Sequence, residues 1–158
     1  MTHRTHNLLN KASAASPFIA RCATRFSPAE IRQAIAELVA YDHTDMADAL
    51  CEAGLALYPD SEDIVSVAAL LAELRQDWPI AQLHLTRLLE IQGHQSQAAV
   101  WQHLIRVVRC QLDILTALQL ARQATVLHPA DPHLSVELAD LIQATSTHMP
   151  SQAVATAQ

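Results

Sequence analysis

The segment "ALQLARQATVLHP" (residues 117–129) decides the fold. Small residues occupy its first, fifth and eighth positions, larger aliphatic residues lie between them, and a proline closes the apolar run. In a helix this spacing puts the small side chains on one face. Two earlier segments, "ADALCEAGLALYP" (47–59) and "AQLHLTRLLEIQG" (81–93), follow the same pattern more loosely. We therefore expect successive helices that approach one another closely through small side chains.

The ends of these segments recur at a nearly constant interval. Pro59 and Gly93 are 34 residues apart, and Gly93 and Pro129 are 36 apart. The longer interval indicates a two-residue insertion near "GHQSQ" (93–97). Each end marker closes an apolar helix and precedes a polar turn, which is the pattern of an internal repeat.

At this period the sequence resembles the tetratricopeptide repeat family, whose 34-residue unit consists of two antiparallel helices. The copy at 98–131 matches best, through a large early aromatic, small residues in the second helix and a closing proline: Trp101, Leu104, Ala117, Ala121, Ala124 and Pro129. A fourth unit starts at 131–143, with Leu138 and Ala139 in the expected places, and stops after one helix. The resemblance covers about 28–143. It implies a right-handed superhelical stack of helix hairpins, about three repeats with a capping helix.

Composition independently favours an all-α fold. Aromatic residues make up 4% of the chain, hydrophobic residues 51%, and there are two glycines. The segment from 27 opens with a capping box, in which Ser27 is the N-cap, Pro28 the first helical residue and Glu30 the third. We predict helices at about 27–41, 44–57, 61–76, 78–91, 95–110, 113–127 and 132–144.

Charge divides the chain into three predicted regions. Residues 1–29 carry four basic and no acidic side chains, whereas residues 30–158 carry all 16 acids against six arginines. We expect a basic, flexible arm at 1–26, a repeat domain at 27–144 and a disordered tail at 145–158. A targeting segment is the alternative interpretation of the arm. Cys22, Cys51 and Cys110 are widely spaced and odd in number, which favours a reducing compartment, and we expect a cytoplasmic protein.

The sequence offers little for catalysis, metal or nucleic acid. An acidic body is unsuited to binding phosphates, and no apolar stretch reaches the length of a membrane span. Nine histidines include no HExxH pair, and the cysteines form no CxxC. The pair His128 and His133 is too small a set for a metal site. With no nucleophile elbow either, we expect no enzyme, no metal and no cofactor.

The resemblance also implies a binding groove lined by the first helix of each unit. In the family register the lining residues are the second, fifth, ninth and twelfth of each unit. The candidate groove residues are Arg32, Ser66, Leu70, Glu73, Gln102, Arg106, Arg109, Val136 and Asp140. We expect an extended or helical peptide with an apolar anchor and an acidic residue near Arg106 and Arg109. Alternatively these two arginines only solvate the surface, or pair with Asp140 and Glu73.

Two functions of different kinds follow from this pattern. The first is a non-catalytic protein-binding module, an adaptor or small chaperone that holds a peptide segment of a partner in the groove. In size and layout the chain is also similar to the small tetratricopeptide chaperones of bacterial type III secretion. The second is a structural subunit that self-assembles into a homo-oligomer or docks permanently into a larger complex, marked by an uncapped apolar end.

Overall fold

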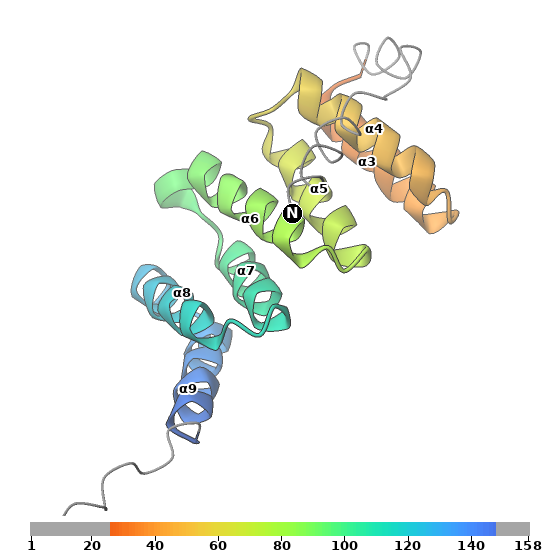
Figure 1. Ribbon diagram of the computed structural model, residues 1–158. Helices are drawn as coiled ribbons and strands as arrows, with labels where there is room; N and C mark the ends of the chain where they lie inside the picture. The colour runs from red at the N-terminus through yellow and green to blue at the C-terminus, as the bar shows by residue number, and fades with distance from the viewer. Residues whose placement is uncertain (1–25, 148–158) are drawn as a thin grey trace, which may run out of the picture. The chain divides into compact units, whose positions relative to one another are not determined.

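The computed structural model describes residues 26–147, and this part of the chain is helical throughout, with no strand (Figure 1). The all-α prediction is confirmed for these residues. The elements are α3 (Pro28–Ala40), α4 (Thr44–Leu57), α5 (Glu62–Leu74), α6 (Trp78–Gln92), the 3-10 turn η2 (Gly93–Gln95), α7 (Ala98–Cys110), α8 (Ile114–Leu127) and α9 (Pro132–Thr147). The chain divides between Asp77 and Trp78 into two compact units, with α3–α5 in the first unit and α6–α9 in the second.

In the first unit α3 and α4 lie side by side, and α5 packs against both (Figure 1). Their core includes the small residues predicted to allow this approach, Ala47, Cys51 and Gly54. A Cβ atom on Gly54 would lie 3.2 Å from Cδ1 of Ile64 and 3.4 Å from Cγ2 of Ile31. Gly54 therefore sits where α4 comes closest to both neighbouring helices, which explains a small residue there.

In the second unit α7 packs against α6 and α8, and α8 packs against α9. The three alanines of the segment that decides the fold, Ala117, Ala121 and Ala124, are each 0% exposed. Trp101 is also buried, and its indole Nε1 donates a hydrogen bond of 3.1 Å to Oγ of the buried Ser96. The predicted core role of Trp101 is confirmed, and the bond to Ser96 satisfies its one polar group.

The same turn follows α3, α5 and α7. Its central residue is left-handed each time, with φ of 60° at Asp42, 58° at Gln76 and 62° at Leu112. The next N–H in each case bonds the carbonyl five residues back: His43 to Leu38 at 2.8 Å, Asp77 to Ala72 at 2.9 Å and Asp113 to Val108 at 3.3 Å. These are Schellman caps spaced by 34 and 36 residues, so the sequence period is also a period of the backbone.

The predicted two-residue insertion is confirmed at the end of α6. The N-cap residues Ser27, Ser61 and Gln97 are spaced by 34 and then 36 residues. The additional length is taken up where α6 gives way to η2, which starts at Gly93 with φ of 53°. Because the left-handed region favours glycine, Gly93 suits this turn.

Some local predictions differ from the structure. The capping box is present, with Glu30 N bonded to Ser27 Oγ at 3.4 Å and Ser27 N bonded to Glu30 Oε2 at 2.8 Å. Ser61, the N-cap of α5, makes no side-chain cap bond, and two acidic residues, Glu62 and Asp63, follow it at the positively polarised end of the helix. α9 continues to Thr147 rather than ending at 144, and Ala139 is exposed instead of packed.

Several predictions concern residues outside 26–147. The arm at 1–26 lies outside the described residues except for Phe26, and so does the predicted tail from His148 onward. Cys22 and the histidines His3 and His6 also fall in the part of the chain that the structure leaves undescribed.

Candidate functional site

An open pocket of about 490 Å³ lies within the second unit, between α7 and α9. Four candidate groove residues line it: Gln102, Arg106, Arg109 and Val136. Their spacing explains this, because Gln102, Arg106 and Arg109 are separated by four and three residues and so share one face of α7. Asp140, predicted on the same surface, lies one turn beyond Val136 on α9, is exposed, and is not among the lining residues.

Two polar contacts tie α9 to α7 and set the pocket's width. Gln102 Nε2 donates to the carboxylate of Asp131 at 3.2 Å, and Arg109 forms an ion pair with Glu137. Asp131 also accepts a bond of 3.0 Å from Leu134 N, so one carboxylate caps α9 and joins it to α7. Because Gln102 and Arg109 lie two helical turns apart, α9 is held along the length of α7 rather than at one point.

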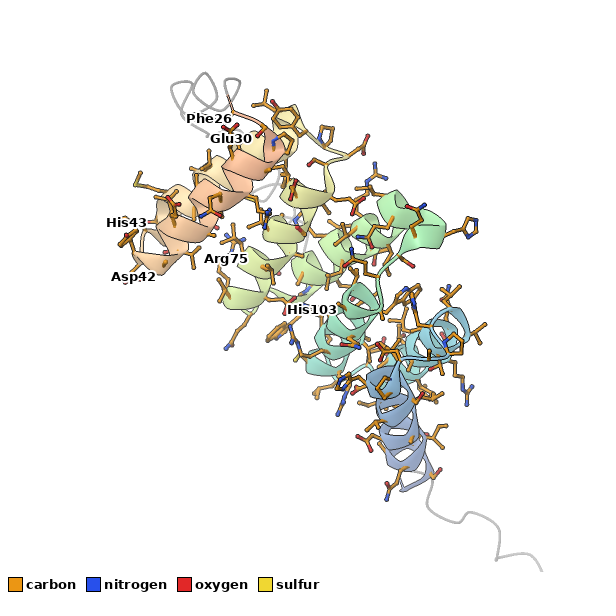
Figure 2. All side chains as sticks on the ribbon, turned by 180° about the vertical axis from the view of Figure 1, so that it is seen from behind. Phe26, Glu30, Asp42, His43, Arg75 and His103 are labelled. Carbon is orange, nitrogen blue, oxygen red and sulfur yellow. The ribbon has the colours of Figure 1, made fainter. Side chains whose placement is uncertain are left out.

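The pocket is positively charged although the chain as a whole carries −6. Its lining contains two arginines and one glutamate, together with the imidazoles of His103 and His133. The Arg106 guanidinium lies 3.3 Å from Nδ1 of His103, which Figure 2 labels on α7. The excess of arginine over glutamate on this concave surface favours an anionic group.

The other candidate groove residues belong to the first unit. Arg32 on α3 forms an ion pair of 2.7 Å with Asp63 on α5. Ser66 Oγ donates to the carbonyl of Asp63 at 3.0 Å. Leu70 is exposed on α5, and Glu73 is partly exposed. The Arg32–Asp63 pair therefore joins α3 and α5, the first helices of two successive predicted repeats, but both partners are partly solvated and the pair contributes little to stability.

One alternative from the sequence is corrected by the structure. That alternative paired Arg106 and Arg109 with Asp140 and Glu73, whereas the partner of Arg109 is Glu137. On α9 the buried residues Leu134 and Leu141 define the inner side of the helix, and Glu137 lies next to them whereas Asp140 is exposed.

Sequence reasoning also missed three lining residues, His103, His133 and Glu137. The family register names four positions in each repeat. His103 and Glu137 fall between those positions, whereas His133 occupies the second position of the fourth repeat. His103 follows Gln102 directly, and Glu137 follows Val136 directly, so a search of neighbouring positions on the same faces would have found them.

The described residues show no alternative chemical site. No three His, Cys, Asp or Glu side chains within 26–147 gather closely enough to hold a metal ion. Cys51 is buried, and this burial, reinforced by the charge of Asp48, raises the pKa of its thiol to about 12. A thiol held in its protonated form is a poor nucleophile, so Cys51 serves packing. No helix in the described range has the length and apolarity needed to cross a membrane.

No family model matches this chain, and no curated protein matches it with statistical significance.

Proposed function

We propose that this protein is a non-catalytic peptide-binding module of the tetratricopeptide kind, acting as an adaptor or small chaperone in the cytoplasm without a cofactor. Its helix hairpins stack into a right-handed superhelix, and a partner segment binds along the first helices. The observation that carries the proposal is the α7–α9 pocket, because it gathers four residues named from the repeat register on one concave surface.

The recurring turn supports the repeat part of this proposal. Three Schellman caps at intervals of 34 and 36 residues end the first helix of each of three predicted repeats in the same way. In repeat proteins, each unit buries its apolar face against its neighbours, and the resulting curvature forms the binding surface. Small residues at 0% exposure along α8 meet the packing requirement of such a stack.

The side chains that line the pocket indicate what kind of peptide it would bind. The arginine side chains favour a carboxylate of the partner, since guanidinium groups bind carboxylates in two-point geometry. Val136 is 62% exposed on the α9 wall and offers an apolar contact. The amide of Gln102 can bond a peptide main chain in addition to Asp131. A peptide with one acidic and one apolar side chain a few residues apart matches these three groups.

Affinity capture tests the proposal directly. Wild-type protein is compared with Arg106→Glu/Arg109→Glu, in which the pocket charge is reversed. The matched control Arg87→Glu/Arg122→Glu makes the same change in net charge on α6 and α8, away from the pocket. We expect wild type and control to recover the same partner and the pocket variant to lose it, with circular dichroism checking that each variant is folded. Equal recovery by all three would refute the pocket assignment.

A structural subunit remains the second candidate, and exposed leucine and valine side chains favour it. Leu115 is 69% exposed and Val126 80% exposed, both on α8. Exposed apolar surface of this kind is common where proteins associate. Sedimentation over a wide dilution range distinguishes the two, because a monomer that persists at all concentrations excludes self-assembly.

A further inference from the structure

Charge is distributed very unevenly between the two units. Residues 26–77 contain eleven carboxylates and two arginines, a net charge of −9, whereas residues 78–147 contain five carboxylates and four arginines, a net charge of −1. Residues 1–25, which precede the first unit, contain four basic side chains and no acid. The most basic segment of the chain, residues 1–25, is therefore followed directly by the most acidic one, residues 26–77.

The first unit also presents an apolar pair on one helix face. Leu70 is 48% exposed and Leu74 is 65% exposed on α5. Four residues apart, they are neighbours along the helix surface, and Glu73 precedes Leu74 directly. We call this surface, made of Leu70, Glu73 and Leu74, the α5 face. Its combination of apolar and acidic groups suits a segment that is both basic and apolar.

The chain enters the first unit at a fixed point. Tyr58 Oη donates a hydrogen bond of 3.0 Å to the carbonyl of Phe26, so the start of the described chain is held against the end of α4. Figure 2 labels Phe26 beside Glu30, at the beginning of α3. The segment before Phe26 is therefore attached to the first unit at the start of α3, close to the end of α4.

The length of the preceding segment is sufficient to reach the α5 face. Fifteen residues separate Lys11 from Phe26, and an extended chain of that length spans up to about 50 Å. α5 has 13 residues, which corresponds to about 20 Å. The segment also contains apolar residues to contact the leucines: Leu8, Leu9, Phe18 and Ile19.

We propose that residues 1–25 dock on the α5 face of the same molecule, with their basic side chains toward the acidic first unit. Leu70 and Glu73 are also candidate groove residues, so the docked segment occupies positions that a partner peptide would use. The docking does not depend on the proposed function, but if both hold, a partner must displace the segment from this part of the groove. Covering the leucines and neutralising the carboxylates both favour the contact.

Carbodiimide crosslinking provides a direct test because Lys11 is the only lysine in the sequence. The reagent joins an amine to a carboxylate only when the two are in contact. In the full-length protein at low salt, we expect mass spectrometry to find Lys11 joined to carboxylates of α5, Glu62, Asp63 or Glu73. Raising salt to about 0.5 M should lower the yield several-fold, since the contact is electrostatic. The variant Lys11→Arg keeps the charge and should show no such product.

Three results would overturn the proposal. They are the absence of any Lys11 product, Lys11 products confined to residues 78–147, and products formed only between copies in a mixture of isotopically light and heavy protein. A second variant pair tests the apolar contact. Leu70→Ser/Leu74→Ser should reduce the α5 product at least about threefold, because burial of each leucine contributes to docking. The control Leu127→Ser, at an exposed leucine of the second unit, should leave the yield unchanged. Equal yields in both would also refute docking on the α5 face.

Discussion

Leu112 holds a backbone conformation that suits glycine, and replacing it should stabilise the second unit. Its φ is 62°, and its N–H bonds the carbonyl of Arg109 at 2.9 Å within the cap that ends α7. A Cβ atom in the left-handed region costs roughly 1–2 kcal/mol. Leucine is not among the residues that relieve this cost with a local side-chain hydrogen bond, as Asp42 can at the equivalent turn.

The gain from Leu112→Gly can be worked out from exposure. The side chain is 85% exposed, so its removal loses about 0.3 kcal/mol of the roughly 2 kcal/mol that full burial of a leucine provides. The greater freedom of glycine in the unfolded chain costs about 0.5 kcal/mol more. Subtracting both from the relieved strain gives a net stabilisation of about 0.2–1.2 kcal/mol.

Urea unfolding followed by tryptophan fluorescence reports on the stability of the second unit, where Leu112 lies. Both tryptophans, Trp78 and Trp101, lie in the second unit with Leu112. With a denaturant dependence of about 1 kcal/mol per molar urea, the midpoint should rise by about 0.2–1.2 M. The matched control Leu112→Ala removes the same side chain but keeps the Cβ atom, and should lower the midpoint slightly. If glycine and alanine behave alike, backbone strain at this turn is not the cause and the reasoning fails.

Three further changes test the packing, the buried thiol and the tie between α7 and α9. Ala121→Leu should destabilise the second unit by about 2–3 kcal/mol in the same urea assay because the site is 0% exposed, whereas Ala139→Leu on the exposed surface should change little. A thiol reagent at neutral pH should label Cys110 in the native protein and leave Cys51 unlabelled. The pKa of Cys51 is raised to about 12 in the folded state from an ordinary value near 9, so the thiol of the unfolded state loses its proton first as the pH rises. The free energy of unfolding should therefore fall as the pH rises from about 9 to about 12, and Cys51→Ala should not show this decrease. Asp131→Ala should lower the free energy of unfolding by roughly 1 kcal/mol through loss of the α9 cap, and so lower the urea midpoint. An unchanged midpoint would show that this carboxylate does not stabilise the start of α9.

The periodicity of the sequence predicts the helices, the small residues at their contacts and the position of the insertion. The small residues are predictable because two helices can approach closely only where the side chains between them are small. Trp101 and the alanines of 117–129 occupy the core as expected. The partner of Arg109 could not be predicted in the same way. Whether Glu137 or Asp140 faces α7 depends on the rotation of α9 about its axis. The buried leucines Leu134 and Leu141 define that rotation, but the family register names Val136 and Asp140 and so does not include Glu137. The concentration of acids in 26–77 is visible in the sequence, but it acquires a structural meaning only once the division at Asp77 is known.

The recurrence of one turn has a consequence for how the length of such a chain can change. Excising residues 43–76 would splice Asp42 directly to Asp77, and the junction would still consist of a left-handed residue followed by the residue that closes the cap. Duplication across the same boundaries would insert a further hairpin with its connection already formed. Gains and losses of a whole period thus leave the junctions intact, and the two additional residues near Gly93 show that a smaller change in length can be taken up at the end of a helix.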